Sequence, residues 1–328
     1  MEEEKSFFKD DTNSLNFVVI SDLHNNKEMF DKFMEWCKVH QEILDVCIML
    51  GDMENYFHNR KMETRDVEEM EKRVIDRCKQ ISLLFKLILF IPGNHEPPMF
   101  YHASSLQISD NVFILHGSIK KICEGLIAAG VGGCIPGVSR KQKIFKGYPF
   151  NTEVDFFNFL QSSQIEKLAQ YYQSSSTSSI SESQLIDDAV IFLTHDGPVH
   201  SLTTFSMNED HIDSLGSVAL SKFLLHSSHS SLLNHIEILL HGHTHESVGF
   251  FGEHIVAQEI AEIEQVQYFD QKFGEYSTNI DEEGVPTEKP FLPFTANCCS
   301  LTLGYFTTFF MKKIEKRWIV EEFSEHFL

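Results

Sequence analysis

The sequence predicts an α/β fold in which strands and helices alternate in layers. Short runs of Val, Ile and Leu without polar alternation recur along the chain, as in strands that are covered on both faces. Apolar residues at helical spacing lie between the first of these runs, over about 27–40 and 64–82. In addition, Asp, Asn or His directly follows the strand-like runs, which is where open α/β sheets place their ligands.

The remaining elements are expected in chain order. The first half predicts strands at 17–20, 46–50 and 87–91. Short strands then follow in quick succession, so we expect a second sheet to form at 112–115, 119–122 and 126–131. The second half predicts helices at 155–172 and 216–226, and strands at 189–193 and 236–240. Three further runs are expected to close the second sheet, at 294–297, 303–311 and 318–323.

One domain is expected to account for the chain. At 328 residues it can bury a large core, and no stretch in its middle has the composition of a long linker. We expect a flexible N-terminus at 1–15 and a single domain over 16–328. Two polar segments are expected to be loop insertions, the serine-rich stretch at 173–188 and the acidic stretch at 257–290.

Composition restricts the compartment and the partners. The formal net charge of −21 argues against nucleic acid as a partner, because phosphate neutralisation requires a basic surface. The seven cysteines have no regular spacing, which indicates a reducing compartment rather than a disulfide framework. The acidic start of the sequence has no apolar core, so no signal peptide is expected, and no apolar stretch is long enough to span a bilayer. A soluble, intracellular, cytoplasmic protein with no membrane partner is expected.

Five short motifs carry the residues that suggest chemistry. They are Ser-Asp-Leu-His at 21–24, Gly-Asp at 51–52, Gly-Asn-His-Glu at 93–96, Thr-His-Asp-Gly-Pro at 194–198 and His-Gly-His-Thr-His at 241–245. Carboxylate, amide oxygen and imidazole together suit divalent cations such as Mn, Fe or Zn. Two Asp, one Asn and four His are too many ligands for one ion, so the set suits two ions that share a carboxylate.

The order of these motifs resembles that of the calcineurin-like metallophosphoesterase family, over residues 22–245. The resemblance implies a four-layer metallophosphoesterase fold, a two-sheet β sandwich flanked by α-helices. It also implies two divalent metal ions, drawn from Mn, Fe, Zn and Mg, with Asp52 as the bridging ligand and His95 as the proton donor or the group that stabilises the transition state. The other implied ligands are Asp22, His24 and His245 for the first ion, and Asn94, His195 and His243 for the second.

Two local motifs indicate which branch of the family the chain resembles. Protein serine/threonine phosphatases continue the second motif as Gly-Asp-x-x-Asp-Arg, whereas this chain has Asn55 and Tyr56 at the last two positions, which disfavours that branch. The stretches at 215–220 and 242–247 look like those of the Icc-related phosphoesterases. In those proteins Asn-Pro-Gly-Ser often follows, whereas residues 297–300 here read Asn-Cys-Cys-Ser.

The resemblance implies a metal-dependent enzyme that hydrolyses a phosphodiester or a phosphomonoester through attack of a metal-bridging hydroxide. Its partner would be a small phosphorylated substrate. An alternative is a scaffold subunit that keeps the fold and acts through protein–protein binding, with the acidic insertions as docking surfaces. A third alternative, a nucleic-acid-processing esterase, is disfavoured by the charge. The complete set of ligand positions favours the enzyme.

Substrate recognition has no clear signature in the sequence. Three basic residues after the glycine-rich stretch 130–133 either meet a phosphate or are ordinary surface bases: Arg140, Lys141 and Lys143. Three aromatic residues after Asp52 either line the pocket or pack within their own loop: Tyr56, Phe57 and His58. Four histidines fit no ligand position and are expected to be structural or solvent-facing: His200, His211, His235 and His241.

Overall fold

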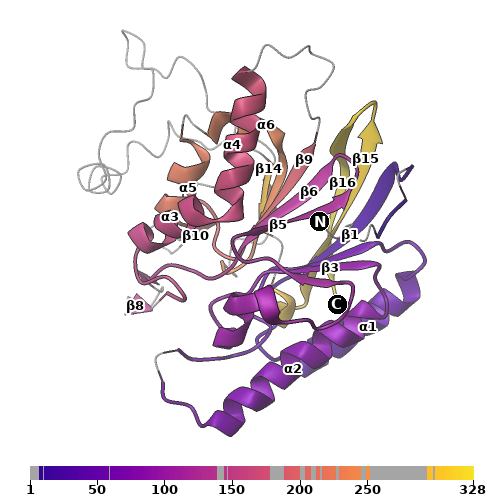
Figure 1. The fold of residues 1–328 in the computed structure, drawn as a ribbon. Helices are drawn as coiled ribbons and strands as arrows, with labels where there is room; N and C mark the ends of the chain where they lie inside the picture. The colour runs from indigo at the N-terminus through magenta and orange to yellow at the C-terminus, as the bar shows by residue number, and fades with distance from the viewer. Residues whose placement is uncertain are drawn as a thin grey trace.

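Two β-sheets pack against each other, and helices cover the outer face of each (Figure 1). This architecture comes from a computed structural model of the chain. It describes residues 7–9, 11–58, 60–138, 144–145, 147–177, 188–199, 204–207, 212–214, 216–226, 229–244, 249–251, 294–297 and 300–328. Within these ranges each main sheet has six strands. The predicted fold class, an α/β sandwich of four layers, is confirmed.

The first sheet has the strand order β16-β15-β1-β2-β3-β4. Its parallel strands are β1 (Ser14–Ile20), β2 (Val46–Met49), β3 (Leu87–Phe90) and β4 (Val112–Ile114). An antiparallel hairpin pairs with β1, formed by β15 (Tyr305–Ile314) and β16 (Arg317–Phe327). Two helices cover this sheet, with the bounds that the apolar spacing predicted: α1 (Lys27–His40) and α2 (Thr64–Ser82).

The second sheet has the order β13-β14-β12-β9-β6-β5. Its strands are β5 (Ser118–Cys123), β6 (Leu126–Val131), β9 (Ala189–Thr194), β12 (Ile236–His241), β13 (Gly249–Phe251) and β14 (Phe294–Asn297). The helices on its outer face are α3 (Glu153–Ser162), α4 (Gln164–Thr177), α5 (Val218–Leu224) and α6 (Ser230–His235). Among the described residues, the smaller elements are two short hairpins and two 3₁₀ helices, at Gly137–Val138 with Ile144–Phe145, Phe205–Met207 with Ile212–Ser214, Pro98–Ser105 and Leu301–Leu303.

Residues of β9 alternate between two hydrophobic clusters, which explains why its sequence is apolar throughout. Ala189, Ile191 and Leu193 belong to the cluster that joins the two sheets and extends to α1 and α2. Val190 and Phe192 belong to the cluster shared with the helices on the outer face of the second sheet. Because both faces of this strand are covered, polar residues do not alternate with apolar ones along it.

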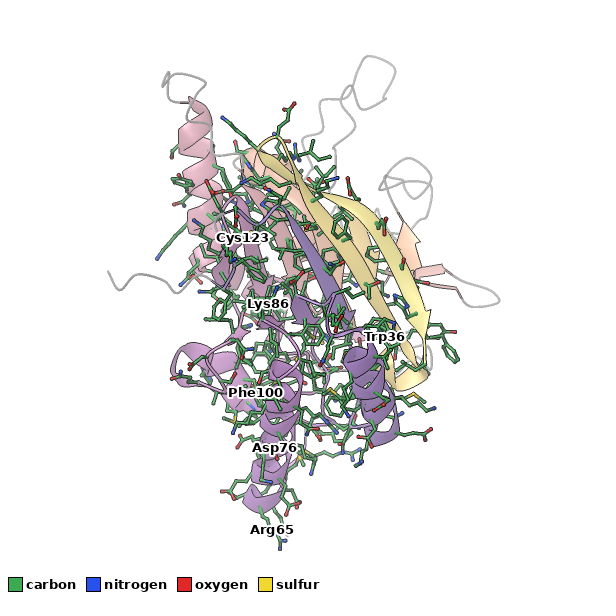
Figure 2. The ribbon with its side chains drawn as sticks, turned by 90° about the vertical axis from the view of Figure 1, so that its right-hand side faces the viewer. Trp36, Arg65, Asp76, Lys86, Phe100 and Cys123 are labelled. Atoms are coloured by element: carbon green, nitrogen blue, oxygen red, sulfur yellow. The ribbon has the colours of Figure 1, made fainter. Side chains whose placement is uncertain are left out.

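The C-terminal hairpin ties the layers together. Trp36 of α1 lies beside it in Figure 2, and its ring centroid is 4.6 Å from that of Phe306 and 5.2 Å from that of His326. On the hairpin itself, Trp318 is fully buried, and its Nε1–H donates to the carbonyl of Glu124 at 3.0 Å. The hairpin therefore contacts a helix of the first layer and the turn that joins β5 and β6 of the second sheet.

Two sheet assignments from the sequence were wrong. The strand expected at 112–115 pairs with β3 in the first sheet, and only 119–122 and 126–131 join the second. The strands expected at 303–311 and 318–323 pair with β1 of the first sheet, whereas 294–297 joins the second sheet as predicted. Local patterns show that a strand forms but carry no information about which open edge receives it, and the free edge of β1 receives the last hairpin.

The single helix expected at 155–172 is two helices. Ser163 lies between them in an extended conformation, with φ −85° and ψ 175°. Its hydroxyl accepts from the N–H of Ile165 at 3.1 Å, and the N–H of Gln164 donates to the carbonyl of Gly117 at 3.0 Å. These bonds start α4 as a new helix, which continues to Thr177 and takes up the first residues of the expected insertion. Residues 178–187 and the whole of 257–290 lie outside the described residues.

No helix among the described residues is both long and apolar enough to cross a membrane.

Candidate metal centre

Five strands end at one edge of the sandwich, and a polar residue follows each of them there. They are the parallel strands β1, β2 and β3 of the first sheet and β9 and β12 of the second. Hydrogen bonds join the loops that follow them. The N–H of His24 donates to the carbonyl of Asp52 at 2.8 Å, which joins the loops after β1 and β2. The N–H of His243 donates to Asp22 Oδ2 at 3.0 Å, which joins the two sheets. The N–H of Gly242 donates to the carbonyl of His195 at 3.1 Å. Residues far apart in sequence are thereby fixed at one place.

The backbone at this edge is strained at the residues that carry the functional side chains. The φ angles of His24, Asp22, Asp52 and His243 are 47°, 53°, 55° and 65°, in the left-handed region. Residues other than glycine rarely adopt this conformation, and it costs on the order of 1 kcal/mol or more for each. Such strain concentrates at functional sites, where the surrounding structure stabilises it.

Two glycines allow the loops after β2 and β3 to touch. Gly51 has φ 93°, and a Cβ at this position would overlap the backbone of Gly93. A Cβ on Gly93 would in turn overlap the backbone nitrogen and a carboxylate oxygen of Asp52. Glycine at both positions is therefore required for Asp52 to lie where it does.

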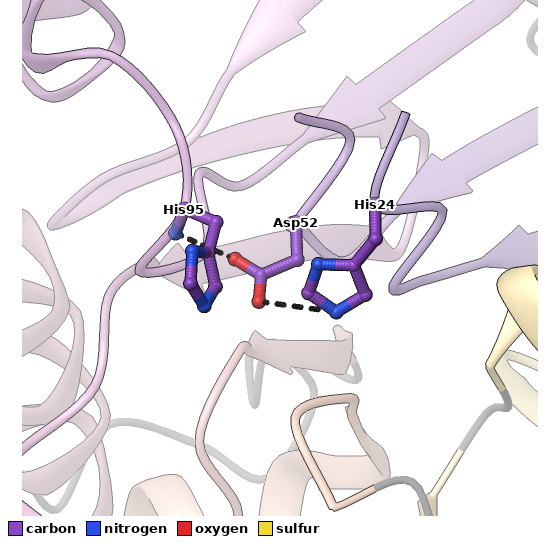
Figure 3. Close-up of side chains that lie close together, drawn as sticks. All are labelled: His24, Asp52 and His95. Atoms are coloured by element: carbon purple, nitrogen blue, oxygen red, sulfur yellow. Dashed lines mark hydrogen bonds and ion pairs between the residues drawn. The ribbon is translucent and has the colours of Figure 1, made fainter. Parts of the chain in front are cut away.

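Asp52 is shared by two clusters of potential metal ligands. One consists of Asp52 with His24 and His95, the other of Asp52 with His195 and His243, and within each the ligand atoms lie within 4.8 Å of one another. Asp52 Oδ2 is 3.8 Å from His24 Nε2 and 3.4 Å from His195 Nε2. Figure 3 shows Asp52 between His24 and His95, with Oδ1 accepting from the backbone N–H of His95 at 2.7 Å. A carboxylate between two imidazole groups is suited to bridge two cations.

Hydrogen bonds orient two of the imidazoles with Nε2 toward the centre. Nδ1 of His195 lies 2.6 Å from the carbonyl oxygen of Leu50, which only accepts, so Nδ1 carries the proton. Its Nε2 then faces Asn94 Oδ1 at 3.0 Å, an approach of two acceptors that a shared proton or cation stabilises. Nδ1 of His24 donates to Asn55 Oδ1 at 3.1 Å, which turns Nε2 toward Asp22 and Asp52, at 3.8 Å from each.

The electrostatics of the centre favour positive charge. Burial alone would raise the pKa of the Asp52 carboxyl, but the imidazoles of His195, His95 and His24 outweigh it and hold this pKa well below its usual range. Burial alone would lower the pKa of His195, but the Asp52 carboxylate, followed by Asp22, raises it to about 10. The carboxylates therefore stabilise a positive charge on their neighbours, whether a proton or a cation supplies it.

His95 is the third member of the first cluster. Its Nδ1–H donates to the carbonyl of Tyr56 at 3.1 Å, and its ring is 5.2 Å from that of His24 at an angle of 75°. The N–H of Tyr56 returns a bond to the carbonyl of His95 at 2.9 Å. These two bonds fix the imidazole so that Nε2 remains for chemistry.

Glu96 was part of a quoted motif, but nothing in the sequence pattern assigned it a role. The side chain is fully buried and accepts from the backbone N–H groups of Asp52, Met53 and Gly93, at 2.8, 2.5 and 2.5 Å. Burial, and then the charge of Asp52, raise its pKa to about 8. Glu96 thus holds the loops that carry Asp52 and Asn94 together. The only indication of Glu96 in the sequence was its place in the third motif, two residues after Asn94.

Arg77 of α2 is a second supporting residue that sequence reasoning missed. Its guanidinium donates to the carbonyl of Met53 at 2.7 Å, to Asn25 Oδ1 at 2.5 Å and to Glu54 Oε1 at 3.2 Å. Glu54 is fully buried and also accepts two bonds from Arg73, at 2.8 and 3.0 Å. Through Arg77 and Arg73, α2 therefore fixes the positions of the loops that follow β1 and β2. The helical pattern of 64–82 marked Arg77 only as polar.

Most of the predicted site residues converge. The residues brought to this edge are Asp22, His24, Asp52, Asn94, His95, His195 and His243. His245 lies outside the described residues, as do His200, His211, Arg140, Lys141 and Lys143. His241 is buried, donates from Nδ1 to the carbonyl of Gly242 at 3.0 Å and has its pKa lowered by burial to about 4. His235 donates to the carbonyl of Asp188 at 2.9 Å, so both described outliers are structural.

The sequence profile of the calcineurin-like phosphoesterases matches residues 15–247, which include all five motifs. The chain belongs to the calcineurin-like phosphoesterase family. This confirms the family that the motif order indicated. Among curated proteins no match to this chain was found.

Solved structures resemble this calcineurin-like phosphoesterase chain at low identity. The protein TT1561 of Thermus thermophilus is 12% identical, with 95% of this chain and 99% of that chain covered and a TM-score of 0.49. A protein described as a novel archaeal phosphodiesterase is 13% identical, with 96% and 100% covered and a TM-score of 0.33. A further crystal structure, for which no protein name is given, is 13% identical with 95% and 100% covered; its TM-score of 0.51 supports a shared fold.

The side chains of this calcineurin-like phosphoesterase fit a divalent metal. The two ligand clusters combine carboxylate with imidazole, a donor set that Mn, Fe and Zn accept. The Nε2 atoms of His24 and His195 face the same carboxylate, that of Asp52. The centre is thus a candidate metal site of a metal-dependent phosphoesterase.

Proposed function

We propose that this chain hydrolyses a small phosphorylated substrate, a phosphodiester or a phosphomonoester, with two divalent ions bound on either side of Asp52. The observation that supports it best is the position of Asp52, which is shared by a cluster with His24 and His95 and a cluster with His195 and His243. Asp22 and Asn94 would complete the two sets from the described residues, and His245 would join Asp22 and His24. The similarity at 215–220 and 242–247 favours the Icc-related branch.

When bound, the ions neutralise the phosphoryl oxygens and lower the pKa of a water. The chain supplies the remaining requirements. Asp52 is held ionised by its histidine neighbours, so it stays a ligand at neutral pH. His95 is fixed through Nδ1, which leaves Nε2 to give a proton to the departing oxygen. The buried bonds of Glu96 and Arg77 keep the loops in place during turnover.

A scaffold that acts only through partners is a weaker proposal for this chain. Binding of partners alone does not require an ionised Asp52 at a strained φ of 55°, nor histidines that turn Nε2 toward it. Maintaining such an arrangement costs stability, which a catalytic or metal-binding role accounts for. Docking surfaces on the insertions expected at 173–188 and 257–290 would be additional to the enzyme.

The reducing, cytoplasmic location stays part of the proposal. Five cysteines among the described residues are buried thiols without a disulfide: Cys37, Cys47, Cys78, Cys123 and Cys134. Burial raises the pKa of the Cys78 and Cys123 thiols to about 12, so these groups are inert hydrophobic residues.

The test measures metal content and turnover on the full chain. Protein prepared with excess Mn²⁺ should retain two ions per chain and hydrolyse bis(p-nitrophenyl) phosphate. Asp52→Asn should abolish turnover and lower the metal content. His95→Ala should reduce kcat by about 10²- to 10⁴-fold while the metal content stays at two, since general acid catalysis contributes on that order.

A matched control separates these effects from general damage. His235→Ala changes a histidine that bonds to the carbonyl of Asp188 far from the centre, and should leave metal content and turnover unchanged. Fewer than two ions per chain, together with no hydrolysis of mono- or diesters, would argue for the scaffold instead.

A further inference from the structure

The segment that follows Asp52 is fixed to both sides of the candidate centre. Asn55 pairs with His24 through its amide, at 3.1 and 2.8 Å. Tyr56 pairs with His95 through backbone and imidazole, at 2.9 and 3.1 Å. The next residue, Phe57, is therefore held at a defined place beside the proton donor.

Phe57 presents an aromatic surface to solvent at this place. Phe57 is large and apolar, yet its relative solvent exposure is 38%. Its ring centroid is 5.6 Å from that of His95, with the planes at 86°. The residue after it behaves differently, because His58 is stacked on Tyr148 at 3.3 Å and 8°. Packing thus accounts for His58 but leaves part of Phe57 uncovered next to His95.

Arg60 stabilises the orientation of this ring. Its guanidinium carbon lies 4.8 Å from the centroid of Phe57, a cation–π contact. The N–H of Arg60 also donates to the carbonyl of Phe57 at 3.1 Å, which closes the turn. The pair therefore forms a small structured surface that combines an aromatic ring with a positive charge.

We propose that Phe57, oriented by Arg60, binds the leaving group of the substrate and selects an alcohol that carries a planar aromatic ring. The proposal rests on the proposed hydrolysis. In that reaction a water gives up a proton and adds to phosphorus, the bond from phosphorus to the ester oxygen breaks, and this oxygen takes the proton of His95, which the proton released by the water replaces. The substituent on the oxygen must then extend into the space beside His95, where Phe57 is the exposed aromatic residue among those described. Two aromatic rings attract each other there beyond simple area burial.

The experiment compares two symmetric diesters, dibenzyl and dimethyl phosphate, together with benzyl and methyl phosphate as monoesters. Their leaving alcohols have similar acidity, so the ratio of kcat/KM for benzyl over methyl reports binding of the ring rather than proton transfer. With Mn²⁺-loaded full chain, Phe57→Ala should lower this ratio about tenfold, the scale of losing part of an apolar contact. Phe57→Tyr should retain it, and Phe57→Leu should give an intermediate value because it keeps apolar area without planarity.

A second measurement does not depend on turnover. Calorimetric binding of benzylphosphonate and methylphosphonate to the Mn²⁺-loaded protein should show tighter binding of the benzyl compound, and Phe57→Ala should remove most of the difference. If benzylphosphonate binds more tightly but no ester is hydrolysed, the proposed function is wrong and the subsite at Phe57 is supported. Equal benzyl-to-methyl ratios in wild type and Phe57→Ala, in both measurements, would overturn the subsite.

Discussion

Asn55 and His24 exchange two hydrogen bonds beside the candidate metal centre. The imidazole Nδ1 of His24 donates to Asn55 Oδ1 at 3.1 Å, and Asn55 Nδ2 donates to the carbonyl of His24 at 2.8 Å. The reciprocal pair fixes both the ring and the backbone, whose φ of 47° is unfavourable for a histidine. Asn55, which distinguishes this chain from the Gly-Asp-x-x-Asp-Arg phosphatases, thus orients a candidate metal ligand.

Asn55→Ala should weaken metal binding. Without Oδ1 as acceptor, the His24 ring is free to rotate and to place its proton on Nε2, which removes the lone pair from the centre. Loss of such a supporting bond lowers metal affinity about 10- to 100-fold. Calorimetric titration with Mn²⁺ measures this directly. Asn13→Ala, at an exposed position, serves as the control and should leave the affinity unchanged; equal affinities in both variants would contradict the role given to Asn55.

Glu96→Gln should destabilise the fold. Both carboxylate oxygens accept buried backbone N–H groups, and the amide nitrogen of Gln cannot accept, so at least one N–H of Asp52, Met53 or Gly93 would lose its partner. An unsatisfied buried donor costs about 1–3 kcal/mol. Urea unfolding gives the free energy. Glu69→Gln, which disrupts an exposed ion pair with Arg65, should change it little. Identical unfolding curves for the two variants would be incompatible with this account.

Arg77→Met should destabilise the protein by about 3 kcal/mol, because it removes three bonds from a buried guanidinium and leaves part of the Glu54 charge uncompensated. Arg77→Lys should recover only part of the loss, since an ammonium cannot match the fork of a guanidinium. Thermal and urea unfolding measure both. Arg65→Met, on the exposed side of the same helix, is the matched control. Full recovery by Lys would show that charge alone matters at this position.

His116 should make stability depend on pH in the acid range. Burial, followed by the charge of His102, lowers its pKa from 6.5 to about 4. The unfolded chain therefore binds the proton first, so the free energy of unfolding falls as pH decreases from about 6.5 to about 4, by at most about 3 kcal/mol. The Nδ1 atom accepts from the N–H of Gly132 at 3.2 Å, a bond that is lost on protonation.

The matched variant for this effect is His116→Asn, which offers an amide oxygen to the same N–H but does not titrate. Urea unfolding at pH 7 and pH 4.5 should show a smaller difference for the variant than for the wild type. The same pH dependence in both proteins would assign the effect to other groups.

Sequence reasoning located most of the centre because its residues directly follow strands. Asp22, Asp52 and His195 each follow a run whose apolar character is local, and parallel strands bring their ends to one edge. The supporting residues were less visible. Arg77 lies in the middle of a polar helix face, and its three acceptors come from loops that only the tertiary structure brings to it.

The fold was predictable in its elements and not in all its pairings. The bounds of α1 and α2 follow from apolar spacing, a local property. By contrast, the break at Ser163 depends on the carbonyl of Gly117, and the placement of the last hairpin depends on the open edge of β1. Both are contacts between distant parts of the chain, which no local pattern encodes.

The bond from His243 to Asp22 also sets an order of events during protein synthesis. The ribosome releases the N-terminal half first, so Asp22, Asp52 and Asn94 can fold into their sheet while the strands that bear His195 and His243 are still being made. The early half carries the whole of the first cluster, Asp52 with His24 and His95, but lacks His195 and His243 of the second. The second cluster can therefore form only after translation has passed β12, and any cation that it binds would be taken up late in maturation.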